Sequence, residues 1–251
     1  MKLILFFLLL ISSSLQIDES KALIIYFSRA GENYSVGTVD KGNTEIIVDY
    51  LTKVTKIKSF KINPETEYPT SYSETVEIAR NEKNSNSRPN IKNPLTSISD
   101  YDVILLGYPI WHTNLPNIVK NQLELLNFEG KTIYPFNTHE GSGTGNSIND
   151  IKNSAPKADV KDGFPLKGQY ARTNASREDI NEWLNNVLQL DIDVPSDATD
   201  ETDATDATDA TDETDENIEV ISNNNNNSNN NNKSYIKDFS VLLLLSCIFI
   251  F

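Results

Sequence analysis

The chain has 251 residues, a net charge of −14 and one cysteine, Cys247. Residues 197–216 carry ten acidic side chains and no basic one, whereas residues 17–190 carry 19 basic and 22 acidic side chains. The main part of the chain is therefore nearly neutral and shows no basic character of the kind that binds nucleic acid. The sequence also lacks a Ser–His–Asp order and a metal-ligand spacing, so it favours neither hydrolytic nor metal chemistry.

The N-terminus resembles a targeting segment. Residues 1–16 begin with Met1-Lys2, continue with the apolar run Leu3–Ile11 and then contain three serines. A short apolar run behind a basic residue is typical of a secretory signal peptide, and this run is too short to span a bilayer. We expect residues 1–16 to be removed from a secreted protein.

The C-terminus has a second apolar segment. In residues 233–251 the polar spacer Lys233–Asp238 precedes the apolar tail Phe239–Phe251. This pattern predicts a GPI-anchor signal, with a short tail anchor as the alternative. The expected location is secreted or at the cell surface, with the membrane contacted only through this C-terminal anchor.

Low-complexity sequence separates this tail from the rest. Residues 191–232 combine a repeated Asp-Ala/Glu-Thr triplet with an asparagine tract, and neither can bury apolar surface. A disordered acidic spacer is predicted there, which leaves residues 17–190 as the single folded domain. Acceptor sequences for N-glycosylation occur at Asn33, Asn174, Asn226 and Asn232.

Strand and helix patterns alternate along residues 17–190. Apolar and β-branched runs predict strands, and apolar spacings of three and four predict helices. The last helix opens with Ser176 and Asp179, a variant of the capping box. The predicted strands are 22–27, 57–62, 101–108, 131–137 and, more weakly, 158–168; the predicted helices are 44–56, 71–84, 117–126, 146–153 and 176–190. This alternation predicts an α/β fold with a doubly wound, five-stranded parallel sheet in the order 2-1-3-4-5.

The loop after the first strand has the composition of a phosphate site. Residues 28–44 contain hydroxyls, glycines and amides, and they lead directly into a helix N-terminus, whose amides and dipole attract anions. The loop matches neither the Walker nor the Rossmann glycine pattern. An ordinary strand-to-helix turn, in which Ser28 and Thr44 are helix caps, stays open as the alternative.

Two further unusual loops follow the third and fourth strands. Trp111 lies between Pro109 and Pro116, and the segment 138–145 is rich in glycine. All three loops are expected at the carboxyl edge of the sheet, where such folds bind ligands. Together they predict a ligand with a phosphate and a planar ring, although Trp111 as a core residue is the plainer alternative.

The same loops carry motifs of a known family. The segments Tyr-Phe-Ser-Arg-Ala-Gly-Glu-Asn-Tyr-Ser (26–35), Gly-Asn-Thr (42–44), Gly-Tyr-Pro-Ile-Trp (107–111), Pro-Phe (135–136) and Thr-His-Glu-Gly-Ser-Gly (138–143) resemble a microbial branch of the flavodoxin-like family. The resemblance covers residues 21–190 and implies non-covalent FMN binding and electron transfer. It places Ser28, Arg29, Gly31, Asn43 and Thr44 at the phosphate, with Ala30, Asn33 and Gly42 in the same loop. It places Pro109, Ile110, Trp111, His112 and Thr113, and Thr138, His139, Glu140, Gly141, Ser142 and Gly143, beside the isoalloxazine.

One departure from the family concerns the third-strand loop. The branch usually has Trp-Gly where this chain has His112-Thr113, so one aromatic plate is replaced by a titratable group. His112 and His139 are the only histidines in the chain. Both are expected in flavin loops, either as loop hydrogen-bonding groups or in a catalytic role.

Three functions remain open at this stage. The first is an FMN electron carrier whose donor and acceptor the sequence does not identify, although a nearly neutral domain has little field to steer a charged partner. The second is an NAD(P)H-dependent quinone or nitro-compound reductase that uses the same FMN. The third is a non-catalytic surface module on a flavodoxin fold.

Overall fold

The computed structural model describes residues 17–189. The predicted signal peptide, acidic spacer and C-terminal tail, with residue 190, lie outside the described residues. Within residues 17–189, every helix is too short or too polar to cross a membrane.

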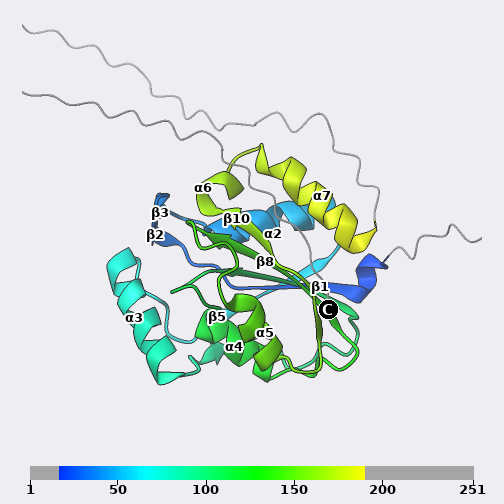
Figure 1. The fold of residues 1–251 in the computed structure, drawn as a ribbon, viewed down its shortest axis with the longest axis horizontal. Coiled ribbons are helices and arrows are strands. Elements are labelled where there is room, and N and C mark those ends of the chain that lie inside the picture. The colour runs from blue at the N-terminus through cyan, green and yellow to red at the C-terminus, as the bar shows by residue number, and fades with distance from the viewer. Residues whose placement is uncertain (1–16, 190–251) are drawn as a thin grey trace, which may run out of the picture. The chain divides into compact units, whose positions relative to one another are not determined.

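A parallel sheet forms the centre of the described chain (Figure 1). Its strands run in the order β10-β8-β7-β1-β4, and β9 pairs in parallel with the start of β8. The bounds are β1 (Ala22–Tyr26), β4 (Lys58–Lys61), β7 (Val103–Pro109), β8 (Thr132–His139), β9 (Asp159–Val160) and β10 (Phe164–Lys167). The predicted order 2-1-3-4-5 is confirmed, and the weak fifth strand is divided into β9 and β10.

Burial explains which strands are central. All five residues of β1 are buried, as are the first six of β7, whereas β4 at the edge has the sequence Lys-Ser-Phe-Lys and no buried residue. Strands covered on both faces are continuously apolar, while an edge strand tolerates charge.

Helices cover both faces of the sheet. Figure 1 shows α2, α6 and α7 on one face and α3, α4 and α5 on the other. Ile47 and Leu184 belong to the first apolar core, and Ile118 and Ile151 to the second. The bounds are α2 (Asn43–Val54), α3 (Tyr72–Ser85), α4 (Asn117–Glu124), α5 (Ser147–Ser154), α6 (Gly168–Ala171) and α7 (Ser176–Leu188), and a short 3₁₀ turn, η1 (Glu19–Lys21), precedes β1.

Two short antiparallel ribbons lie outside this pattern. One pairs β2 (Gly31–Asn33) with β3 (Gly37–Val39), so the polar excursion after β1 is a hairpin. The other pairs β5 (Asn63–Pro64) with β6 (Ile91–Lys92).

The predicted capping box of the last helix is wrong. Ala175 is the N-cap of α7, and the buried Ser176 hydroxyl donates to the Thr173 carbonyl oxygen at 2.8 Å. The Asp179 carboxylate instead accepts from the Tyr170 hydroxyl at 2.9 Å. Both side chains are therefore bonded to α6 and the turn that follows it, and neither bonds to the amides of the first turn of α7.

Candidate functional site

The carboxyl ends of β1, β7 and β8 border a cavity of about 310 Å³. Its lining includes most of the residues that the sequence placed at a ligand: Ser28, Arg29, Asn33, Asn43, Thr44, Pro109, Ile110, Trp111, Thr138, His139, Glu140 and Ser142. Segments far apart in the sequence therefore meet at one edge of the sheet, as expected for this topology.

Seven of the predicted residues do not line this cavity: Ala30, Gly31, Gly42, His112, Thr113, Gly141 and Gly143. Two of these glycines serve close packing. A Cβ on Gly42 would lie 2.3 Å from the Ser28 Oγ, and one on Gly31 would lie 2.8 Å from the Thr70 carbonyl oxygen. His112 is turned away, because its Nε2 lies 2.8 Å from the Val76 carbonyl oxygen on α3.

Two tyrosines line the cavity that the sequence analysis did not place there, Tyr34 and Tyr72. Their rings lie 5.8 Å apart at an interplanar angle of 32°, and both side chains are exposed. Tyr34 lies in the polar turn between β2 and β3, where an aromatic residue is the signal that could have indicated it. Tyr72 begins α3, and only the tertiary fold brings it to the hairpin.

The N-terminus of α2 forms the anion-attracting side of the cavity. Its N-cap, Gly42, provides no side-chain cap, and the Ser28 hydroxyl accepts from the Glu45 amide at 3.1 Å instead. The amides of Asn43 and Thr44, in the first turn, have no acceptor within the helix. Thr44, which is 1% exposed, has its hydroxyl 2.9 Å from that of Thr138. Ser28 is therefore a helix cap that also lines the cavity, which reconciles the two alternatives drawn from the sequence.

Arg29 brings a positive charge to the same side. Its guanidinium donates to the carbonyl oxygens of Pro69 at 2.8 Å and Thr70 at 3.3 Å, and also to that of Glu32. None of the ion pairs within residues 17–189 involves Arg29. Burial lowers its pKa, but an arginine guanidinium remains charged at neutral pH. Arg29 thus joins the hairpin to the start of α3 and leaves a cation beside the cavity.

Trp111 contributes both to the core and to the cavity wall. Its ring packs edge-to-face against Phe27, with centroids 5.3 Å apart, and against Tyr68 at 4.9 Å. These contacts fix the orientation of the indole. A rigid aromatic surface in a cavity wall can support a planar ligand.

The loop after β8 closes the opposite side. The amide of Gly141 donates to His139 Nδ1 at 2.9 Å, and the buried Asn137 donates from Nδ2 to the Gly143 carbonyl oxygen at 3.0 Å. Burial, assisted by the charge of Lys167, lowers the pKa of His139. His139 therefore makes a hydrogen bond within its own loop, whereas His112 bonds to the carbonyl oxygen of Val76 on α3.

Glu140 presents a polar group that needs a partner. Burial raises the pKa of its carboxyl, although the amides of Gln169 and Gly168 act in the opposite direction. Its Oε1 is buried beside the backbone of Gly168, and within residues 17–189 no hydrogen bond of good geometry is formed to it, although the amides of Gly168 and Gln169 lie close by. A buried acceptor of this kind is normally satisfied by water or by a ligand.

The turn that follows Trp111 has an unusual backbone. His112 and Thr113 have φ values of 47° and 63°, and the amides of Trp111 and Asn114 donate to each other's carbonyl oxygens. A β-branched residue in this region is strained. Glycine, which lacks a Cβ, would adopt this φ without strain.

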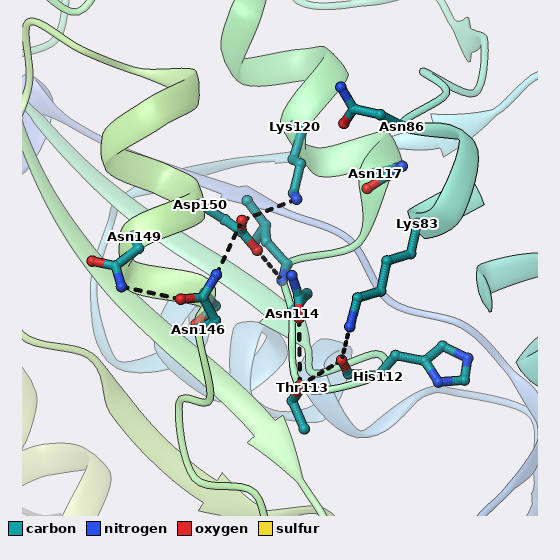
Figure 2. A network of polar contacts seen from close by, with 12 residues as sticks. Lys83, Asn86, His112, Thr113, Asn114, Asn117, Lys120, Asn146, Asn149 and Asp150 are labelled. Carbon is teal, nitrogen blue, oxygen red and sulfur yellow. Dashed lines mark hydrogen bonds and ion pairs between the residues drawn. The ribbon is translucent and has the colours of Figure 1, made fainter. Parts of the chain in front are cut away.

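Polar contacts hold this turn from two sides (Figure 2). On one side, Lys83 Nζ donates to the His112 carbonyl oxygen at 3.0 Å. On the other, the amide of Asn146 donates to the Thr113 carbonyl oxygen at 2.7 Å, and that of Leu115 donates to the Asp150 carboxylate at 3.0 Å. Figure 2 also shows the His112 ring projecting away from Thr113 and Asn114.

The arrangement fits a ligand with an anionic end, hydroxyl groups and a planar ring. Amides, hydroxyls and a cation lie at the start of α2, an acceptor lies at Glu140, and aromatic side chains lie at Trp111, Tyr34 and Tyr72. Within residues 17–189 there is no cluster of metal-ligating side chains.

Comparison with known proteins agrees with this fold. A family model described as flavodoxin matches residues 21–187. A crystal structure of a candidate flavoprotein from Bacteroides eggerthii DSM 20697 is 29% identical with a TM-score of 0.54, covering 68% of this chain and 99% of that chain. One from Bacteroides uniformis ATCC 8492 is 24% identical with a TM-score of 0.52, covering 66% of this chain and 98% of that chain.

A more distant structure is a flavoprotein from Lactobacillus acidophilus NCFM in complex with FMN. It is 19% identical with a TM-score of 0.46, covering 64% of this chain and 99% of that chain. No curated protein sequence matches the chain.

Proposed function

Because the chain belongs to the flavodoxin family, we propose that its cavity binds FMN non-covalently and that the protein transfers electrons. The observation that carries this proposal is the meeting of three loops, after β1, β7 and β8, around one cavity. When bound, FMN supplies the redox chemistry, and the protein supplies binding, orientation and electrostatics.

The donors and acceptors of the cavity fit the parts of FMN. The first-turn amides of α2, the hydroxyls of Ser28 and Thr44 and the charge of Arg29 suit a phosphate. The buried Oε1 of Glu140 suits the hydroxyls of the ribityl chain, which can donate to it. Trp111 and the residues 138–143 would lie beside the isoalloxazine.

An absorbance spectrum tests this proposal directly. Full-length protein purified from cells that supply FMN is expected to be yellow, with an oxidised-flavin band near about 450 nm. Heat release and a shift of the flavin spectrum should accompany titration of flavin-free protein with FMN. A colourless, folded protein that takes up no FMN would contradict the proposal and favour a surface module without a cofactor.

A second function, reduction of a small organic acceptor, is favoured by one observation. A cavity of about 280 Å³ adjoins the first and shares Arg29, Asn33, Tyr72, Ile110 and Trp111 with it. A carrier that only meets protein partners has no use for such a cavity, whereas a reductase needs one next to its flavin. Oxidation of NADH or NADPH by a quinone, measured with and without the protein, distinguishes the two functions.

We also propose that the protein is secreted and tethered. The apolar segments of residues 1–16 and 233–251 support this proposal through their length and flanking residues. Expressed in cells that attach GPI anchors, the protein should lose its tail and be released from membranes by phospholipase C. Recovery of residues 239–251 in the mature protein would contradict the GPI anchor.

A further inference from the structure

The cavity between α3 and the turn 111–114 has its own set of side chains. Thr75, Val76 and Ala79 of α3 and His112 line it, and none of them lines the larger cavity. Thr75 and Ala79 are 4% and 7% exposed, so the part of α3 that lines this cavity is packed against the rest of the domain. Its volume of about 280 Å³ lies near the lower end of the range for small-molecule pockets.

Most of the polar groups around this second cavity are already satisfied. The Thr75 hydroxyl donates to the Ser71 carbonyl oxygen at 2.8 Å, and the Arg29 guanidinium is bound to backbone carbonyl oxygens. The remaining walls from Val76, Ala79, Ile110 and Trp111 are apolar or aromatic. Such walls favour a flat, largely apolar ligand.

His112 is a polar group of this wall with remaining capacity. A carbonyl oxygen can only accept, so the contact of 2.8 Å with Val76 requires the hydrogen on Nε2. The neutral ring then carries its lone pair on Nδ1, which is left for a ligand that donates.

We propose that this second cavity binds a small planar aromatic molecule that carries a phenolic hydroxyl, which donates to His112 Nδ1. The ring would pack between Val76 and Ala79 of α3 and the indole of Trp111. The shared wall of Arg29, Ile110 and Trp111 places this ligand next to the cavity assigned to FMN. The inference therefore rests on the proposed function for its meaning as a substrate site, but binding itself does not require FMN.

The backbone on which His112 lies supports this assignment. Lys83 and the strained turn hold His112 in place, through the bond to its carbonyl oxygen at 3.0 Å (Figure 2).

The test uses full-length protein freed of flavin and 1-naphthol, whose hydroxyl can donate to His112 Nδ1, as the probe. The chain has two tryptophans, and Trp183 stacks on Phe164 away from this cavity. We expect the probe to quench the fluorescence of Trp111, and the quenching to be lost in Trp111→Phe. Calorimetry gives the affinity independently of fluorescence.

Two variants locate the site. Ala79→Leu fills the cavity and should weaken probe binding by about tenfold or more, whereas Arg80→Leu on the exposed side of α3 should not change it. His112→Phe keeps an aromatic ring but removes Nδ1, and should weaken binding several-fold even if Ala79→Leu fails to fold. FMN affinity should stay within about twofold in both variants, because neither residue lines the FMN cavity.

The outcomes separate this inference from the proposed function. Equal probe affinity in wild type, Ala79→Leu and His112→Phe would overturn the second site. Displacement of the probe by FMN, one for one, would also overturn it, because both ligands would then share one cavity. Probe binding that depends on His112 in a protein that takes up no FMN would uphold the site and contradict FMN binding.

Discussion

At the scale of single residues, Thr44 connects the start of α2 with the end of β8. Its buried hydroxyl lies 2.9 Å from that of Thr138, at the side of the cavity assigned to the phosphate. Thr44→Ala should weaken FMN binding by about 1–3 kcal/mol, because a charged acceptor loses a donor. Calorimetric titration measures this loss. Thr52→Ala is the matched control on the same helix, since its hydroxyl donates to the Asp49 carbonyl oxygen away from the cavity, and an equal loss there would contradict the assignment.

His139 gives the loop after β8 a dependence on pH. Its folded pKa is lowered from 6.5 by burial and Lys167, so the unfolded chain binds a proton more readily. Stability should therefore fall as the pH falls below 6.5 toward the lower folded value, as Nδ1 becomes protonated and can no longer accept from Gly141.

The variant His139→Asn isolates this effect, because the amide keeps an acceptor oxygen and does not titrate. Unfolding free energy and FMN affinity, measured between about pH 7.5 and 5, should decline more steeply in the wild type than in the variant. Parallel profiles would show that His139 is not the titrating group.

At the scale of elements, Asp150 ties α5 to α4 and to the turn after β7. Its carboxylate, 8% exposed, pairs with Lys120 at 3.0 Å and accepts from the Leu115 amide at 3.0 Å (Figure 2). Asp150→Ala should destabilise the fold by about 3–5 kcal/mol, because it leaves Lys120, whose side chain is only 12% exposed, without its carboxylate partner. Asp150→Asn keeps an acceptor for Leu115 and should lose less.

Denaturant titration of the two variants measures both losses. The control is Glu129→Gln, which removes an exposed ion pair with Lys157 and should leave the unfolding midpoint unchanged. If Asp150→Ala were no more harmful than Glu129→Gln, the network of Figure 2 would not stabilise the turn.

At the scale of the whole molecule, the proposed FMN binding and N-glycosylation would compete for the β2–β3 hairpin. Asn33 is half-buried, lines both cavities and donates from Nδ2 to the Gly31 carbonyl oxygen at 2.9 Å, whereas Asn174 is exposed between α6 and α7. In protein secreted from eukaryotic cells, Asn174 should carry a glycan and Asn33 should not, because a hydrated glycan would crowd the cavity. Glycopeptide mass spectrometry measures both sites. High occupancy at Asn33 with full FMN content would contradict the position assigned to this residue.

The sequence by itself determined the order of the elements, the parallel sheet and the family. Buried strands such as β1 and β7 are continuously apolar, and this local pattern is visible without the fold. The loops that border the cavity could be predicted from this strand order, because a parallel sheet places the carboxyl ends of its strands at one edge.

Only the tertiary structure decided which side chains face the cavity. His112 lies one residue after Trp111, yet positive φ angles and a bond to α3 turn it toward a second cavity. Tyr72 joins Tyr34 because Arg29 and Glu32 bind the segment 69–72, 40 residues away along the chain. The capping box predicted from Ser176 and Asp179 is absent because these side chains bond to Thr173 and Tyr170 instead. Side-chain direction depends on such long-range contacts, and a local pattern in the sequence does not contain them.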